Sequence, residues 1–200
     1  THSQSYESFY SNIPGLKVIT VRHPYDAKGL LKSAIRDHGP VLFMESERMY
    51  GEKGEIPGGE YLLPIGVANV AKEGKDVTIV SFGKMMKVAL GAAEELAKEG
   101  IDAEVIDLRT IRPWDKAAVL KSVRKTNRLV VVDENWPFGS VASEIAYRVQ
   151  KDAFDYLDAP VLRINQADTP LPFTPTLIDA SLPSVERTVR AVKEVMYLVK

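Results

Sequence analysis

The chain has no cysteine among its 200 residues. A disulfide framework, a thiol nucleophile and a thiolate metal site are therefore excluded, and a reducing compartment fits the composition. No apolar run approaches the ~20 residues of a membrane-spanning helix, and the polar residues 1–6 lack the apolar segment of a signal peptide. The net charge of −1 gives no sign of a polyanionic partner. We therefore expect neither a membrane nor a nucleic acid as a partner.

Nucleotide-binding motifs are missing as well. No G-x-G-x-x-G follows a strand-like run, and the turn after residues 77–82 holds the single glycine Gly83. A dinucleotide site is therefore not expected, and there is no Walker A motif. The three histidines, His2, His23 and His38, are scattered and form no pair at the helical spacing that would indicate zinc.

What the chain does contain is an alternation of strand-like and helix-like segments over residues 76–134. Apolar runs predict strands, and apolar residues at helical spacing predict the helices between them. The expected strands are 77–82, 103–108 and 129–134, and the expected helices are 85–99 and 116–126. Strands joined through helices are parallel, and strands that are apolar on both faces need helices on both faces of the sheet. We therefore predict an α/β fold with a mainly parallel sheet.

Local signals place the neighbouring elements. Residues 65–70 predict a short strand that forms an antiparallel hairpin with the strand at Val77, and residues 109–114 predict a loop. Asp115 and Ser140 are placed to cap the helices that follow them, because their side-chain oxygens can accept from free N–H groups of the first helical turn.

The C-terminal part is predicted in the same way. Residues 160–164 form another expected strand. Pro170, Pro172 and Pro175 should keep residues 166–182 irregular, so that helix resumes at Ser181 or Ser184. The last helix should carry apolar residues on one face, at Val185, Val189, Val192, Met196 and Val199.

Residues 1–50 predict a strand–helix–strand unit, with strands at 16–21 and 41–44 and a helix that starts at Pro24. The expected apolar face of that helix consists of Leu30, Leu31, Ala34 and Ile35. Two strands alone leave sheet edges unpaired. We infer that residues 1–50 are the end of a domain whose front half is missing, or that they dock on another structure. The Gly- and Pro-rich residues 51–64 predict an interdomain linker.

Charged residues follow the predicted parallel strands, where α/β proteins place their sites. They are Asp107, Asp133 and Glu134, with Arg109 and Arg112 close by. One interpretation is a polar functional site. We favour the other, in which these residues form loop salt bridges and helix caps.

Trp114, Trp136 and Phe138 allow two interpretations, a partner-binding surface or ordinary packing. His2 is the side chain best suited to acid–base chemistry, although a histidine in a polar N-terminal segment is more often a solvated bystander. The residues alone thus predict an α/β domain and a partial domain, and they predict no reaction.

Several motifs resemble the beta subunit of the decarboxylating component of 2-oxoacid dehydrogenase complexes, most of all members that act on pyruvate. They lie at residues 2–5, 13–18, 26–37, 45–51, 63–66 and 107–115, collinear over essentially the whole chain. The resemblance implies that residues 1–50 are the end of an incomplete pyrimidine-binding domain. It further implies that 51–64 are a linker and that 65–200 are a transketolase C-terminal domain.

The resemblance also implies a chemistry. In that family thiamine diphosphate supplies the electron sink for oxidative decarboxylation of pyruvate, and the acetyl group passes to a lipoyl group. His2 matches the family's active-site histidine, which would donate protons during acetyl transfer. Four residues, Ala34, Ile35, Asp37 and Gly39, match a monovalent-cation site, such as one for potassium, that is built largely from backbone carbonyls at a helix C-terminus.

In that family the glutamate that activates the cofactor would lie upstream of Thr1, and an alpha subunit would hold the diphosphate and its magnesium. We therefore expect no cofactor-binding residue in these 200 residues and no activity from them alone. The implied partners are the alpha subunit and a second beta subunit in a heterotetramer, and the subunit-binding domain of a lipoyl acyltransferase. The implied location is the bacterial cytoplasm or the mitochondrial matrix.

Two alternatives stay open. The same chemistry could act on a branched-chain 2-oxoacid or on acetoin, because substrate choice depends mostly on residues outside this chain. An alternative of another class is a non-catalytic interaction module.

Overall fold

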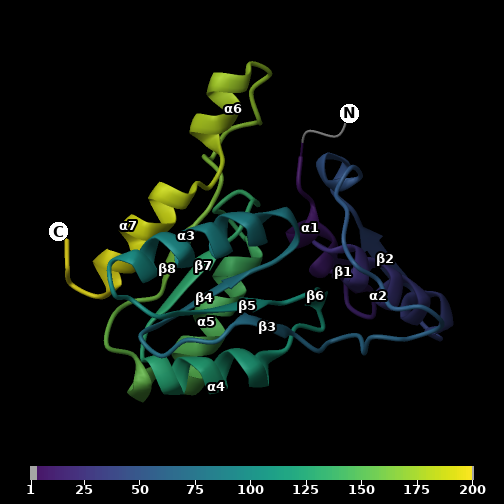
Figure 1. Cartoon of the computed structure of the whole chain (residues 1–200), viewed down its shortest axis with the longest axis horizontal. Coiled ribbons are helices and arrows are strands. Elements are labelled where there is room, and N and C mark those ends of the chain that lie inside the picture. Colours follow the sequence, from purple (N-terminus) through teal and green to yellow (C-terminus); the bar gives the residue numbers. More distant parts are fainter. Residues whose placement is uncertain (1–3, 200) are drawn as a thin grey trace.

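The computed structural model describes residues 4–199, which form an N-terminal lobe (residues 4–50) beside a larger C-terminal lobe (residues 66–199) (Figure 1). The N-terminal lobe holds α1 (Glu7–Ser11), β1 (Lys17–Thr20), α2 (Pro24–Arg36), β2 (Val41–Met44) and the 3₁₀ turn η1 (Glu47–Met49). Residues 51–65, which form no helix or strand, join the two lobes.

The C-terminal lobe confirms the predicted fold class. Its strands are β3 (Asn69–Lys72), β4 (Val77–Ser81), β5 (Ala103–Asp107), β6 (Thr110–Arg112), β7 (Leu129–Val132) and β8 (Leu162–Ile164). Its helices are η2 (Gly83–Met85), α3 (Met86–Lys98), α4 (Lys116–Thr126), α5 (Val141–Ala153), η3 (Phe154–Tyr156), α6 (Pro175–Ser181) and α7 (Val185–Val195). The main sheet has the order β3-β5-β4-β7-β8, in which all pairs are parallel except β3 with β5.

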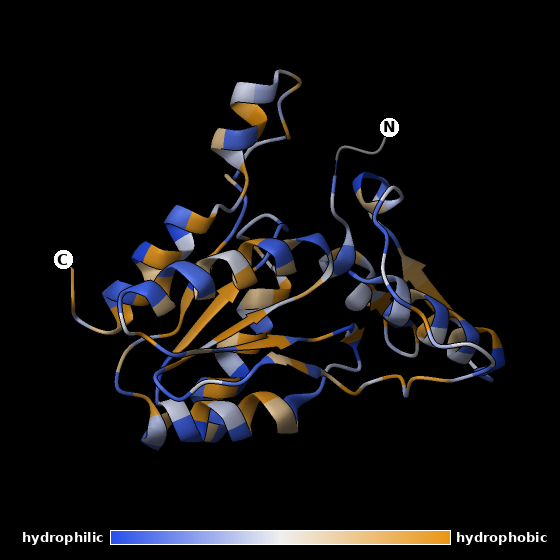
Figure 2. Ribbon diagram, viewed as in Figure 1, coloured by the Kyte–Doolittle hydropathy of each residue, from blue (hydrophilic) through white to orange (hydrophobic). Residues whose placement is uncertain are grey.

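Helices cover both faces of this sheet because neighbouring strand residues point to opposite sides. Ile79 packs with α3 and α7, whereas the next residue, Val80, packs with α4 and α5. Figure 1 shows α3 and α7 above the sheet and α4 and α5 below it. Figure 2 shows the hydrophobic residues gathered on the strands and on the helix sides that face them. Among residues 4–199 no helix is long and apolar enough to cross a bilayer.

The predicted helix caps are confirmed. The Asp115 carboxylate accepts a hydrogen bond from Ala118 N at 2.9 Å, and Ser140 Oγ accepts from Ser143 N at 3.2 Å. The prediction for residues 166–182 is wrong in part, because α6 is a helix inside this segment. Pro175 takes its first position, where the missing N–H has no partner to lose.

The hairpin predicted between residues 65–70 and the strand at Val77 is also wrong. The strand here is β3, which starts later and pairs antiparallel with β5. Both sides of β4 are taken by the parallel strands β5 and β7, so β3 cannot pair with β4 and instead forms the sheet edge beside β5. The turn after β3 therefore has to pass across the start of β5.

Residues 109–114 are not only a loop. Their centre is β6, which pairs antiparallel with β1 of the N-terminal lobe, with Ile19 opposite Thr110 and Val18 opposite Arg112. The sheet order is β2-β1-β6. One edge of the two strands of residues 1–50 is thus paired with the C-terminal lobe.

The apolar face predicted for α2 is only partly correct. Leu30 is fully buried, but the side chains of Leu31 and Ile35 are 42% and 74% exposed. The buried face instead includes Asp26 and Gly29. At Gly29 the linker packs so closely that a β-carbon would lie 2.7 Å from the Leu63 side chain. The helix therefore turns a small residue and a charged one, rather than Leu31, toward the interior.

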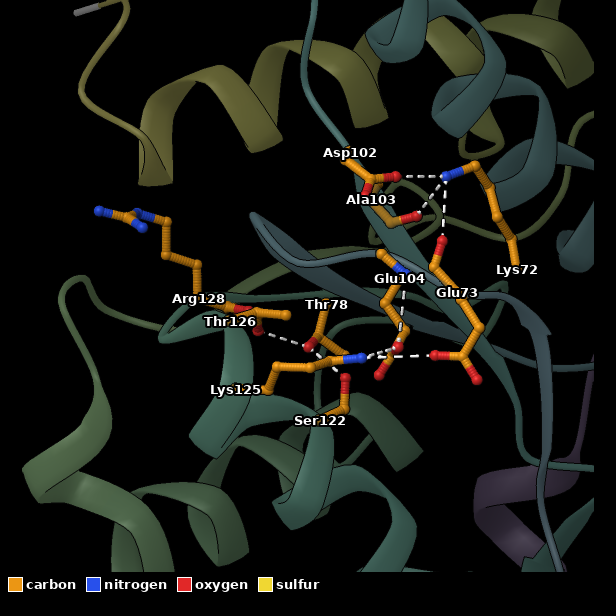
Figure 3. A network of polar contacts seen from close by, with 11 residues as sticks. Lys72, Glu73, Thr78, Asp102, Ala103, Glu104, Ser122, Lys125, Thr126 and Arg128 are labelled. Carbon is orange, nitrogen blue, oxygen red and sulfur yellow. Dashed lines mark hydrogen bonds and ion pairs between the residues drawn. The ribbon is translucent and has the colours of Figure 1, made fainter.

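A polar network ties α4 to the amino ends of β4 and β5 and to the turn after β3 (Figure 3). Thr78 Oγ1 lies 2.6 Å from Ser122 Oγ and 2.7 Å from Thr126 Oγ1. The Lys125 ammonium pairs with the buried Glu104 carboxylate. Burial raises the pKa of Glu104, but hydrogen bonds from Lys125 and Ser122 outweigh it and bring the pKa below its usual value.

Gly74, in the turn after β3, gives a test of this arrangement. A β-carbon there would lie 2.3 Å from Ala103 C and Glu104 N, backbone atoms that cannot move aside without displacing β5. We expect Gly74→Ala to lower the free energy of unfolding by about 2–3 kcal/mol, measured by urea unfolding. Gly51→Ala is the control, because no atom lies within 4 Å of a β-carbon there. Equal stability of the two variants would contradict the close packing of this turn.

Candidate functional site at the junction of the two lobes

Two ion pairs cross the junction in opposite directions. Arg22, just after β1, donates from Nε to Asp107 Oδ2 at 2.9 Å, and Arg109, just after β5, lies with Nη2 2.6 Å from Asp26 Oδ1 of α2. Both carboxylates are buried, with Asp107 1% and Asp26 2% exposed. The junction is therefore held by charges that are removed from water.

The backbone adapts to this arrangement at Arg109, which has a φ of 58°. Its N–H donates to Asp107 Oδ1 at 3.1 Å, and its carbonyl accepts from Thr20 N at 2.9 Å. Burial raises the pKa of Asp107 to about 6, although the Arg22 guanidinium acts in the opposite direction. A small cavity of about 260 Å³ adjoins the pair and is lined by residues that include Arg22, His23 and Glu55.

Removing one partner tests how much these pairs matter. Arg22→Met leaves the buried Asp107 carboxylate without its cation, so we expect a loss of about 2–4 kcal/mol in unfolding free energy near pH 8. Without Arg22 the pKa of Asp107 rises further above about 6. The folded state then takes up a proton on acidification, and the loss should be smaller near pH 5 (about 1–2 kcal/mol). The measurement is urea unfolding at the two pH values.

Lys98→Met is the matched control, because it removes the exposed pair of Lys98 with Glu95. It should cost under about 0.5 kcal/mol at both pH values. A loss for Arg22→Met that is the same at both pH values would contradict an uncompensated Asp107 charge as its cause.

The second group of charges follows β7. Asp133 is fully buried; its Oδ2 accepts from Ala142 N at 3.0 Å, and its Oδ1 accepts from Asn135 N at 2.8 Å and from Asn135 Nδ2 at 2.7 Å. Burial raises the pKa of Asp133, although the hydrogen bonds from Ala142 and Asn135 act in the opposite direction. Glu134 pairs with the Lys84 ammonium at 2.5 Å. These contacts fit the favoured interpretation, in which the strand-end carboxylates cap helices and form salt bridges.

Helix α1 lies against this group. Asn135 Nδ2 donates to Glu7 Oε2 at 3.3 Å, and Ser8 N donates to Asn135 Oδ1 at 3.0 Å. Arg112 Nη1 donates to Ser11 O at 2.6 Å. Burial raises the pKa of Glu7 to about 7, helped by the negative charges of Asp133 and Glu134. The first residue of α1, Glu7, thus carries a carboxyl group whose pKa is raised to about 7.

Glu7 should make stability depend on pH. Below pH 4.5, its ordinary value, Glu7 is protonated in both states; between 4.5 and about 7 only the unfolded chain loses the proton. Stability therefore falls as the pH rises through this window. We expect Glu7→Gln to match the parent near pH 4 and to be about 2 kcal/mol more stable near pH 8, measured by urea unfolding. The exposed Glu95→Gln is the control, expected to change stability by under about 0.5 kcal/mol. A Glu7→Gln effect that does not vary with pH would contradict the raised pKa.

A groove of about 1210 Å³ runs between α1 and the start of α5. All three aromatic residues that the sequence singled out line it, namely Trp114, Trp136 and Phe138. Phe138 is 93% exposed, whereas Trp136 Nε1 donates to Thr169 O at 2.8 Å and Trp114 packs on the core. Packing accounts for the two tryptophans, and a partner surface stays a prediction for Phe138.

The residues predicted for a monovalent-cation site lie apart from this junction. His2 lies outside the described residues. Ala34 and Ile35 are in the last turn of α2, and Asp37 follows as its cap. Both Asp37 oxygens lie 2.6 Å from Lys17 Nζ, and Oδ1 accepts from Gly39 N at 2.8 Å. The Lys17 hydrogen bond lowers the pKa of Asp37.

Some residues of the junction were not predicted from the sequence. No local sequence pattern marks Glu7, Arg22, Asp26 or Asn135. Glu7 contacts Asn135, Arg22 contacts Asp107 and Asp26 contacts Arg109, and in each pair the two residues are about 80 or more positions apart in the sequence. His23 caps α2, since its Nδ1 accepts from Tyr25 N at 3.2 Å. Within residues 4–199 no three His, Asp or Glu side chains are grouped as a metal site requires.

Comparison with protein families decides where the chain belongs. Residues 66–188 match the family described as "Transketolase, C-terminal domain", and residues 1–53 match "Transketolase, pyrimidine binding domain". The chain belongs to the transketolase C-terminal domain family. The resemblance stated from the sequence motifs is confirmed, since similar proteins include beta subunits of the pyruvate dehydrogenase E1 component.

Three relatives show how similar this chain is to known proteins and how much of each protein it covers. The pyruvate dehydrogenase E1 component subunit beta of Rhizobium meliloti is 53% identical over 98% of this chain and 43% of that protein. The mitochondrial subunit beta-1 of Oryza sativa is 52% identical over 98% of this chain and 54% of that protein. The acetoin:2,6-dichlorophenolindophenol oxidoreductase subunit beta of Cupriavidus necator is 48% identical, with 98% and 58% covered. The chain spans about half the length of these relatives.

A solved structure supports the fold. It is described as a split gene transketolase, an inactive beta4 tetramer, and superimposes with a TM-score of 0.80 at 27% identity. The match covers 96% of this chain and 61% of that one.

Proposed function

We propose that this chain is part of the beta subunit of a thiamine diphosphate-dependent 2-oxoacid dehydrogenase, with pyruvate as the substrate. The observation that carries the proposal is the identity of about half of the residues with pyruvate dehydrogenase E1 beta subunits over 98% of the chain. The reaction is oxidative decarboxylation followed by acetyl transfer to a lipoyl group. By this proposal residues 1–50 are the end of a pyrimidine-binding domain that is incomplete in this chain, 51–64 are the linker, and 65–200 are the C-terminal domain.

In this proposal His2 is the catalytic residue of the chain. An imidazole can release and take up a proton near neutral pH, which suits acetyl transfer to a lipoyl sulfur. The described residues offer no acidic cluster for magnesium. These residues therefore do not fit a site for magnesium and a diphosphate group. We place it in an alpha subunit and in beta-subunit residues that precede this chain.

We further propose a monovalent-cation site, one for potassium, at the C-terminal end of α2. Its carbonyls at Ala34 and Ile35 are in the last turn of the helix, where backbone oxygens are short of intrahelical partners. The Ala34 carbonyl accepts from Asp37 N at 3.2 Å and keeps a second lone pair for a cation. The Lys17 ammonium already offsets the Asp37 charge. The carbonyls, including that of Gly39, would therefore supply most of the ligation.

The proposed partners are an alpha subunit and a second copy of the beta subunit in a heterotetramer. A lipoyl acyltransferase would dock on the C-terminal lobe. The split-gene transketolase chain forms a beta4 tetramer, which supports contact between beta chains here. The proposed location is the cytoplasm of a bacterium or the mitochondrial matrix, since relatives come from bacteria and mitochondria.

A second candidate substrate is acetoin, because an acetoin oxidoreductase beta subunit is 48% identical to this chain. Branched-chain 2-oxoacids are a third. Both would leave the chemistry of His2 unchanged.

The test uses the full-length beta subunit together with its alpha subunit. Two rates are measured, pyruvate decarboxylation with an artificial electron acceptor and acetylation of a lipoyl domain. We expect His2→Ala to lower lipoyl acetylation by roughly 10²-fold or more and decarboxylation by much less. His38→Ala is the control and should change neither rate. Activity with acetoin or branched-chain acids alone would reassign the substrate, and no activity with any of them would favour a non-catalytic interaction module.

A further inference from the structure

Helix α1 depends on the C-terminal lobe for its position. It has five residues, of which all but Phe9 are partly buried and none is fully buried, and no side chain caps its N-terminus. A helix of this length has little stability of its own in water. Tyr10 packs on the hydrophobic core, and α1 also lies against β1. Its hydrogen bonds to the C-terminal lobe come from Asn135 and Arg112, and the Trp136 ring lies 6.3 Å from the Tyr6 ring in an edge-to-face arrangement.

Asn135 is the most firmly fixed of these three residues. It is 1% exposed and directly follows the carboxylates at the end of β7. Its backbone N–H and its amide both donate to Asp133 Oδ1, and its carbonyl accepts from Asn165 Nδ2 at 3.0 Å. The remaining amide positions face α1, one donating to Glu7 and one accepting from Ser8. The rigid end of the sheet is thereby connected directly to the first turn of α1.

We propose that Asn135 is a positioning residue, which holds α1 and with it the chain segment that carries His2. This inference rests on the proposed function, because it concerns the residue given the catalytic role there. His2 precedes Glu7 by only five residues, so the placement of α1 limits where His2 can reach. Asn135 touches neither substrate nor cofactor in this role; it acts through α1.

The charges around Glu7 make this contact sensitive to its ionisation. Asp133 and Glu134 face Glu7 from the end of β7, and Lys84 of η2 is engaged by Glu134. An ionised Glu7 meets two negative charges, and a protonated Glu7 keeps the Asn135 hydrogen bond without that repulsion. Docking of α1 should therefore be tighter when Glu7 is protonated, and Glu7→Gln should preserve the tight form at higher pH.

The experiment uses the full-length beta subunit in complex with its alpha subunit. Asn135→Ala should lower lipoyl acetylation by roughly tenfold while pyruvate decarboxylation stays within about twofold. Hydrogen–deuterium exchange should rise in residues 4–12 and stay unchanged in α5. Asn127→Gly is the control; it removes an amide that donates to Tyr156 O away from α1 and tolerates the φ of 60° at that position.

Glu7→Ala is the second variant, because it removes one of the two hydrogen bonds between Asn135 and α1 without altering the end of β7. It should reproduce the Asn135→Ala pattern, whereas Glu7→Gln should retain the acetylation rate and make it less sensitive to pH between about 6 and 8. Equal loss of both reactions, with faster exchange throughout the C-terminal lobe, would overturn the inference in favour of a purely structural role. Unchanged acetylation and unchanged exchange in residues 4–12 would also overturn it.

The His2→Ala complex separates this inference from the proposed function. If that variant acetylates lipoyl groups normally, the role of His2 fails whatever Asn135→Ala does. If His2→Ala loses acetylation and Asn135→Ala does not, only the positioning role of Asn135 fails.

Discussion

The pairing of β6 with β1 is the constraint on which the junction depends. The N-terminal lobe brings only β1 and β2 among the described residues, and its inner edge would otherwise leave backbone donors and acceptors unpaired. The three residues of β6 supply that edge from the chain just after β5. Because β6 also leads from the main sheet into α4, the N-terminal lobe is fixed relative to the carboxyl ends of the parallel strands.

The charges at the junction follow from that fixed geometry. Placing β1 beside β6 brings Arg22 to Asp107 and Asp26 to Arg109, away from water. Removing such charges from water offsets much of their attraction, so these pairs are poor sources of stability by themselves. Their arrangement is specific, however, because the wrong register would leave two buried carboxylates unpaired. The two pairs therefore determine how the lobes fit together more than how stable the chain is.

Local patterns predicted the elements that depend on neighbouring residues. The strand and helix alternation of residues 76–134, and the caps at Asp115 and Ser140, could be inferred because each involves atoms within a few residues. β6 could not, since three residues next to Pro113 carry no strand signal and the partner is about 90 residues away. Asn135 was missed for the same reason: its partners in α1 are 127 and 128 residues distant.

The placement of α1 indicates why the two lobes occur in one chain. The C-terminal lobe contributes no acidic cluster for a metal within its described residues, yet Asn135 and Arg112 hold a helix that belongs to the other lobe. A five-residue helix adopts a single position only if the surfaces around it define that position. Under the proposed function, the parallel sheet would support the chemistry indirectly, by offering the rigid end of β7 as one such surface. A working enzyme would then need both His2 on the N-terminal segment and the supporting residues Asn135 and Arg112 on the C-terminal lobe.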